Sequence, residues 1–300
     1  MSETIVVTGA TGRIGTPLVK RLIEEGHSVR CLVRSAEGEA AVKLLGGEAI
    51  RGDLSDAEAL RRCVIGASAV FHLAGGVRGK GSVTADKLNG EGTKLLVDAC
   101  RTESSIKAFV FASTCSVYGD RSSLWVEEDF VTSPNTLYAK SKVKAENTAL
   151  AAMSAGGLPV RIARIGAVYG KGFPFCMVER MQAEKAWLPG EGRNCIPVIH
   201  VDDCVSALIH LKNCGEDGGV YHVADRTSPS LKEFYKEIHK HVGGKEVRFW
   251  STYLPSYIQA FFAAKNEAVK SAMGRKPRFT PDNLLLYKNS VRLKTDKLAD

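Results

Sequence analysis

Apolar residues in the first half of the chain form short continuous runs, which alternate with segments where apolar residues recur every three or four positions. The runs predict strands buried on both faces, and the periodic segments predict amphipathic helices. The predicted strands are residues 4–8, 28–33, 48–51, 68–73, 106–112 and 159–164, and the predicted helices are residues 13–25, 36–45, 56–63, 85–100 and 135–155. This regular alternation predicts an α/β fold with a doubly wound parallel sheet and helices on both faces.

The alternation ends near residue 170, where proline and glycine begin to interrupt the chain at 173–174 and 188–192. Short strands and helices follow without strict order, which predicts a smaller C-terminal α/β lobe. We therefore assign residues 1–170 to the sheet domain and residues 171–300 mainly to a substrate-binding lobe, segments of which can return to the sheet. The place where such a lobe meets the strand ends is the usual ligand cleft.

Three glycines separate the first predicted strand from the first predicted helix, in the sequence TGATGRIG at residues 8–15. Gly9 permits a tight turn, Gly12 lets the backbone approach a pyrophosphate, and Gly15 lets the helix pack closely on the strand. The pyrophosphate then lies at the helix N-terminus, beside Thr11, Arg13 and Ile14. This placement predicts a Rossmann dinucleotide site for a nicotinamide cofactor.

The end of the second strand indicates which nicotinamide cofactor binds. NAD-binding chains carry an acidic residue there, about 20 residues after the glycine motif, for the ribose 2′-hydroxyl. This chain has Arg34, whose guanidinium suits a 2′-phosphate, and Arg13 can add a second positive charge. We favour NADP(H), with NAD(H) as the alternative if Arg34 is only a solvated charge. Asp53, after the third strand, is placed to accept a hydrogen bond from the adenine amino group.

Tyr138 and Lys142 lie four residues apart in the sequence YAKSK, which begins a long predicted helix. That spacing puts both side chains on one face, one turn apart. A tyrosine pKa of about 10 is too high for easy proton exchange at neutral pH. We expect Lys142 and an oxidised nicotinamide to lower it by about 3 units, or about 4 kcal/mol, and Lys142 also to hold the nicotinamide ribose.

These motifs occur, together with five others, in the order found in one enzyme family. The others are HLAG at 72–75, NGEGT at 89–93, FVFASTCSVYG at 109–119, RIGAVYG at 164–170 and IHVDD at 199–203. The chain resembles the extended short-chain dehydrogenase/reductases over nearly its whole length. The resemblance implies that Thr114, four residues before Tyr118, carries the catalytic hydroxyl. Ser113 is the neighbouring candidate, and only one of the two should face the substrate because successive strand residues point in opposite directions.

The resemblance also implies further cofactor contacts and an assembly. The contacts are Leu54, Leu73, Ala74, Gly75, Ser113, Ile165 and Val168, together with Tyr138 and Lys142. Related enzymes are often dimers through the helices at 85–100 and 135–155, so we expect a homodimer.

Two departures from the family pattern bear on the substrate. Ile196 stands where nucleotide-sugar members often carry an arginine for the substrate phosphates, although Arg193 lies close enough to substitute. Cys115 and Ser116 follow Thr114, where sugar 4,6-dehydratases have an Asp-Glu pair. A smaller departure is Ile165, where the family often has proline.

The leading hypothesis is an NADP(H)-linked ketone/alcohol oxidoreductase, similar to the dihydroflavonol-reductase and 3β-hydroxysteroid-dehydrogenase branch. Aromatic residues near the C-terminus, Trp250, Tyr253, Phe261 and Phe262, suggest a fairly hydrophobic small-molecule substrate. One alternative is a nucleotide-sugar epimerase with tightly held NAD. Another is a non-catalytic NADP(H)-binding redox sensor, against which the intact Tyr138 and Lys142 argue.

Composition argues against several other functions. The net charge is +8, but lysine and arginine are dispersed, so we expect no nucleic-acid partner. Eight cysteines form no CxxC pair, and His239 and His241 do not share a helix face, so we expect no metal site. The chain shows no 18-residue apolar stretch and no secretory signal, which predicts a cytoplasmic protein without a membrane span.

Overall fold

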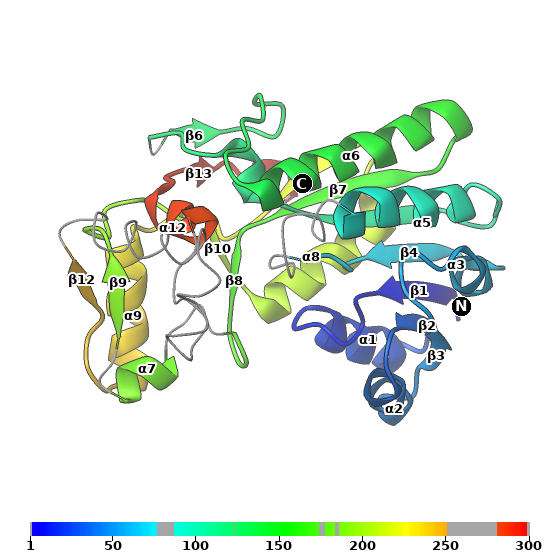
Figure 1. The fold of residues 1–300 in the computed structure, drawn as a ribbon, viewed down its shortest axis with the longest axis horizontal. Helices are drawn as coiled ribbons and strands as arrows, with labels where there is room; N and C mark the ends of the chain where they lie inside the picture. Colours follow the sequence, from blue (N-terminus) through cyan, green and yellow to red (C-terminus); the bar gives the residue numbers. More distant parts are fainter. Residues whose placement is uncertain are drawn as a thin grey trace, which may run out of the picture.

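A seven-stranded parallel sheet forms the centre of the protein (Figure 1). The computed structural model describes residues 2–76, 87–122, 124–173, 178–183, 186–250 and 281–298. The strand order is β11-β7-β5-β4-β1-β2-β3. The strands are β1 (Thr4–Thr8), β2 (Ser28–Val33), β3 (Glu48–Arg51), β4 (Ala69–His72), β5 (Ala108–Thr114), β7 (Val160–Ile165) and β11 (Val220–Val223). Every residue of β4, β5 and β7 is buried, as predicted for strands covered on both faces.

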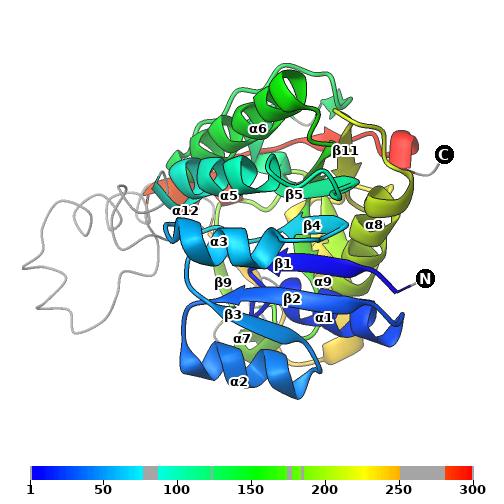
Figure 2. The same cartoon turned by 90° about the vertical axis from the view of Figure 1, so that its right-hand side faces the viewer.

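Helices cover both faces of the sheet, which confirms the doubly wound prediction (Figures 1 and 2). One face packs against α1 (Gly15–Glu24), α2 (Ala36–Leu44) and α8 (Val201–Cys214). The other packs against α3 (Ala57–Val64), α5 (Gly92–Cys100) and α6 (Leu137–Gly156). Both α8 and β11 lie beyond residue 170, so these segments of the second half return to the main sheet.

Polar side chains fix where the helices begin. Ser35, Asp56 and Thr136 each precede a helix and accept a hydrogen bond from a backbone N–H in its first turn. The first helix begins two residues later than predicted, because the glycine loop continues to residue 14. The helix predicted at 85–100 contains a π-helical turn at Lys87–Glu91 before α5, and residues 85–86 lie outside the described part.

The second lobe has its own apolar core. It contains α7 (Val178–Gln182), β9 (Trp187–Pro189), α9 (Leu231–Val242) and β12 (Arg248–Trp250), with β9 and β12 paired. Beside it, β8 (Ala167–Tyr169) pairs with β10 (Val198–His200), and β6 (Trp125–Val126) pairs with β13 (Arg292–Leu293). Helix α12 (Pro281–Lys288) and a 3₁₀ turn at Asp296–Leu298 complete the chain. Tyr253, Phe261 and Phe262 lie outside the described residues, as does the side chain of Trp250.

Within the described ranges, no helix is long and apolar enough to cross a membrane. The same residues hold no cluster of histidine, cysteine and acidic side chains with the arrangement of a metal site.

Candidate active site

The glycine loop and the turn after β4 press against each other. Gly9 has a φ of +75°, and a Cβ there would lie 2.8 Å from the backbone N of Ala74. A Cβ on Gly15 would lie 2.1 Å from the carbonyl oxygen of Gly9, and Gly12 N donates to that same oxygen at 2.9 Å. Gly9 and Gly15 are therefore required by backbone conformation and by space, as the motif predicted. The loop thus lies beside the predicted cofactor turn, Leu73–Ala74–Gly75.

The end of β2 brings Arg34 to the side of this loop. Arg34 is exposed, and Ser35 caps α2 by accepting a hydrogen bond from Gly38 N at 3.1 Å. Asp53 Oδ1 accepts hydrogen bonds from the N and Oγ of Ser55, at 2.7 and 2.5 Å. These bonds, more than the charge of Arg34, hold the pKa of Asp53 below its usual value. Because Oδ1 already accepts two hydrogen bonds from Ser55, Oδ2 is the oxygen that can accept one from an adenine.

Two apolar residues predicted as cofactor contacts have side chains that pack in the sheet cores. Leu54 is 3 % exposed and packs against Gly92 at the start of α5. Ile165 is buried among the residues between the sheet, α1 and α8. Only their backbone atoms remain for a cofactor, whereas Val168 is half-buried.

Three predicted site residues come together where β5 ends and α6 begins. Thr114, the last residue of β5, hydrogen-bonds to Tyr138, and its Oγ1 accepts a hydrogen bond from Ser116 N at 3.2 Å. Lys142 is 4 % exposed, and its Nζ donates to the carbonyl oxygen of Ala112 at 2.8 Å.

The neighbouring hydroxyl, Ser113, contacts a different residue of α6. It donates a hydrogen bond to Glu146 on α6. The side chains of Ser113 and Thr114 therefore both contact α6, at residues eight positions apart. A cofactor contact at Ser113 falls to its backbone.

Lys142 Nζ also lies beside the turn after β4. A Cβ on Gly75 would be 3.1 Å from Nζ and 3.0 Å from Asn89 Oδ1, so a larger residue would displace the ammonium. Asn89 accepts a hydrogen bond from Gly76 N at 3.0 Å and donates to Ser141 Oγ at 2.9 Å. Asn89 thus ties the predicted cofactor turn to α6, the helix of the predicted catalytic pair. The sequence showed it only as the first residue of NGEGT.

Burial dominates the electrostatics of the catalytic pair. It raises the pKa of Tyr138 to about 12, helped by Cys115 and opposed by the hydrogen bond from Thr114. It lowers the pKa of Lys142 to about 8, opposed by the negative charge of Glu146. The expected lowering of the Tyr138 pKa by Lys142 is therefore not produced by the protein's own groups. Formation of a phenolate would need the positive charge that an oxidised nicotinamide supplies when bound.

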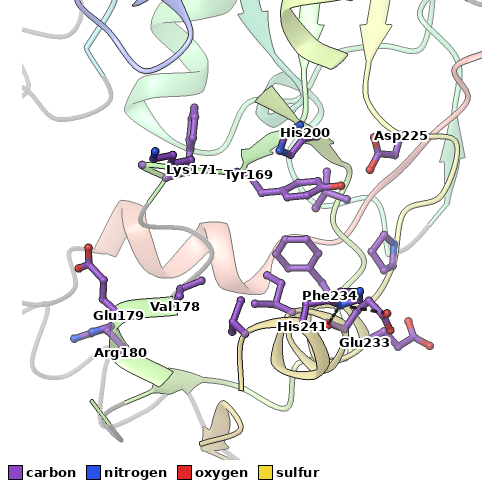
Figure 3. A pocket seen from close by; sticks show the side chains of 18 of the residues that line it. Tyr169, Lys171, Val178, Glu179, Arg180, His200, Asp225, Glu233, Phe234 and His241 are labelled. Atoms are coloured by element: carbon purple, nitrogen blue, oxygen red, sulfur yellow. Dashed lines mark hydrogen bonds and ion pairs between the residues drawn. The ribbon is translucent and has the colours of Figure 1, made fainter. Parts of the chain in front are cut away.

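A cavity of about 1270 Å³ opens from the glycine loop into the second lobe. Its lining runs from Arg13, through the segment after β8 and the start of α7, to α9, while Thr114, Tyr138 and Lys142 lie outside it. Figure 3 shows Tyr169 between His200 and Phe234 in its wall. The Tyr169 ring packs edge-on against both, with centroid separations of 5.4 Å to His200 and 5.5 Å to Phe234. His200 caps α8 and also lines this cavity.

The two residues used to judge phosphate binding lie away from this cavity. Ile196 is buried in the core of the second lobe. The Arg193 side chain is 86 % exposed and pairs with Glu191 at 2.9 Å. Neither residue is among those that line the cavity.

Comparison with known proteins gives consistent matches. The profile of the NAD dependent epimerase/dehydratase family matches residues 5–224. The chain is 30% identical over 254 residues to a dTDP-glucose 4,6-dehydratase of Streptomyces griseus, covering 78% of this chain and 76% of that protein. It is 33% identical over 221 residues to a 2-alkyl-3-oxoalkanoate reductase of Stenotrophomonas maltophilia, covering 69% and 64%.

Solved structures show the same fold. The UDP-glucuronic acid 4-epimerase from Bacillus cereus, in complex with UDP-glucuronic acid and NAD, superposes with a TM-score of 0.73 at 24% identity. The superposition covers 83% of this chain and 86% of that one.

Proposed function

Because the chain belongs to the NAD-dependent epimerase/dehydratase family of extended short-chain dehydrogenase/reductases, it is a nicotinamide-dependent enzyme, and we propose a specific reaction for it. The reaction is reduction of a ketone or aldehyde on a fairly hydrophobic small molecule by NADP(H), or oxidation of the matching alcohol. The observation that carries the proposal is the contact of Thr114 with Tyr138, one helical turn from the buried ammonium of Lys142.

The protonation of Tyr138 suits the reducing direction. With its pKa raised to about 12, Tyr138 carries its proton at neutral pH. It can therefore give that proton to a substrate oxygen as hydride reaches the carbonyl carbon. The Thr114 hydroxyl orients the same oxygen, and Lys142 supplies positive charge beside the phenolate that forms. The reduced nicotinamide supplies the hydride when bound.

The preference for NADP(H) rests on Arg34. It is exposed at the end of β2, next to the glycine loop, where a 2′-phosphate on the adenosine ribose would meet a guanidinium. Titration of the protein with NADPH and with NADH tests this preference, because equal affinities would show that Arg34 does not bind a 2′-phosphate.

The cavity supports a largely apolar substrate. Apolar and aromatic side chains from β8, β10 and α9 form much of its wall, including Tyr169, Val198, Phe234 and Ile238. Ile196 is buried and apolar, and the Arg193 side chain is in solvent beside Glu191, so neither supports a phosphate where nucleotide-sugar members often carry an arginine. The name of the reductase from Stenotrophomonas maltophilia points in the same direction.

A nucleotide-sugar epimerase with tightly held NAD is the second candidate. The names of the relatives from Streptomyces griseus and Bacillus cereus favour it, as do Lys171 and Arg180 in the cavity wall. A dehydratase reaction is less well supported, because Cys115 and Ser116 stand where its acid and base would be.

One experiment separates these reactions. Alkyl ketones, 3-oxo acids, steroids, flavonoids and nucleotide sugars are supplied with NADPH or NADH, and cofactor absorbance and product isomers are followed. We expect NADPH consumption with an apolar ketone, and its loss in Tyr138→Phe with cofactor affinity retained. Turnover that survives in Tyr138→Phe contradicts the mechanism, and isomerised sugar without net cofactor consumption identifies the epimerase.

We also propose a homodimer through α5 and α6, which lie side by side on one face (Figure 2). Sedimentation of the wild-type protein tests it, since a monomer at micromolar concentration would refute it.

A further inference from the structure

Glu146 is a buried acid on the catalytic helix that the reaction described above does not use. It lies one turn after Lys142 and is 3 % exposed. Its Oε2 accepts a hydrogen bond from Arg164 Nη2 at 2.9 Å, and its Oε1 accepts one from Arg164 Nε at 3.2 Å. The hydroxyl of Ser113 donates to the same Oε1. Because Ser113 and Arg164 are cross-strand neighbours on β5 and β7, one carboxylate joins α6 to two strand ends.

Three successive residues of β5 contact three residues of α6 that are spaced one turn apart. Ala112 accepts from Lys142, Ser113 donates to Glu146, and Thr114 hydrogen-bonds to Tyr138. Residues four apart on a helix share one face, so these contacts fix both the rotation of α6 and its position along β5.

Resting on the proposed function, we propose that Glu146 is a positioning residue that sets α6 in register with β5 and keeps the Lys142 ammonium charged. The Arg164 guanidinium holds the carboxylate in place through two hydrogen bonds. Arg164 itself is anchored, because its Nη1 donates to the Tyr118 hydroxyl at 2.7 Å and to the carbonyl oxygen of Glu128 at 2.9 Å.

The charges around Lys142 support the second part of the proposal. Burial lowers the pKa of Lys142, and Glu146 is the acid that opposes this. His72 on β4 also faces Lys142, and its own lowered pKa keeps it neutral at neutral pH. Tyr138 keeps its proton. The carboxylate of Glu146 is therefore the negative charge that keeps Lys142 protonated.

The test compares variants that remove the charge with variants that keep it. Glu146→Gln removes the carboxylate but leaves the buried Arg164 guanidinium without an anion, which can prevent folding. The double variant Glu146→Gln/Arg164→Gln removes both charges and should fold more readily. Glu146→Asp keeps the charge. Asp217→Asn is the matched control, because it breaks another ion pair of β7, Arg161–Asp217 at 3.0 Å.

The first measurement is an NMR titration of the Lys142 side chain in the protein without cofactor, assigned by comparison with Lys142→Met. We expect the midpoint to fall by about 1 unit or more when the acid is replaced by glutamine, alone or with Arg164→Gln. Glu146→Asp and Asp217→Asn should leave it close to the wild-type value. An unchanged midpoint in the double variant overturns the charge role, and this result does not depend on any substrate.

The second measurement addresses the register. Ser113→Ala removes one contact of Glu146 and keeps its charge, so kcat should fall about tenfold or more while the Lys142 midpoint stays in place. In the double variant the alkaline limb of the kcat profile should move to lower pH by the same amount as the Lys142 midpoint. Wild-type kcat in Ser113→Ala overturns the register role. Absence of turnover in the wild-type protein would refute the proposed function instead, while the NMR result would still stand.

Discussion

His72, the last residue of β4, is held as a neutral imidazole. Its Nδ1 lies 2.7 Å from Thr8 Oγ1, and its Nε2 lies 2.9 Å from Thr93 Oγ1. Thr93 gives its own hydroxyl proton to the carbonyl oxygen of Asn89 at 2.6 Å, so it must accept a hydrogen from Nε2. Nδ1 therefore carries no proton and accepts from Thr8. Every polar atom of the neutral ring is satisfied.

This environment makes the stability of the protein depend on pH. Burial, and secondarily the charge of Lys142, lowers the pKa of His72 from its usual 6.5 to about 3. Below about pH 6.5, His72 therefore binds a proton in the unfolded chain but not in the folded chain. The stabilisation is fully present above about pH 7 and is lost as the pH falls from there towards the folded pKa. Between about pH 7 and about pH 5 the loss from this residue is about 2 kcal/mol.

Urea unfolding of the wild type and of His72→Gln, at about pH 7 and about pH 5, measures this loss. Glutamine keeps one donor and one acceptor but does not titrate, so the variant should lose about 2 kcal/mol less than the wild type on acidification. His222, whose pKa burial also lowers, is present in both proteins and cancels in the comparison. Equal losses in the two proteins would refute the reasoning.

Three further substitutions test the site. Arg34→Ala should weaken NADPH binding about tenfold and leave NADH binding unchanged, as measured by fluorescence titration; equal weakening of both contradicts the 2′-phosphate role. Gly15→Ala places a Cβ 2.1 Å from the Gly9 carbonyl oxygen, so it should abolish cofactor binding and lower the thermal midpoint. The matched change Gly38→Ala meets nothing nearer than 3.4 Å and should do neither. Thr114→Val should lower kcat about a hundredfold with cofactor affinity retained. A smaller loss of kcat in Thr114→Val than in Ser113→Ala would show that the catalytic hydroxyl is not on Thr114.

The parts of the predicted site whose local geometry could be read from the sequence depend on spacing along the chain. The glycine loop, with Gly9 and Gly15, is set by a strand, a tight turn and a helix that follow one another directly. Tyr138 and Lys142 share a face because they are one helical turn apart. Thr114 was preferred to Ser113 because it stands four residues before Tyr118, the position that the family resemblance implies.

The parts that sequence reasoning missed depend on three-dimensional contact. The pairing of Glu146 with Arg164 needs α6 to pack over β7, and the only sequence signal was an acid four residues after Lys142 in a helix. The raised pKa of Tyr138 in the protein without cofactor was not anticipated, because it comes mainly from burial, which is a property of the packed site. The cavity wall was missed because its residues come from β8, β10 and α9, which are distant in the chain.

The cavity wall and the reacting groups come from different halves of the chain. Apart from Arg13, every residue that lines the cavity falls between 169 and 242, whereas Thr114, Tyr138 and Lys142 all precede residue 143. On the proposed function, a mutation in α9 should change which molecule enters without altering the groups proposed to handle the proton. If the cavity binds the substrate, as proposed, substrate range can change while the groups at β5 and α6 stay constant, so a laboratory search for new substrates should randomise the wall first.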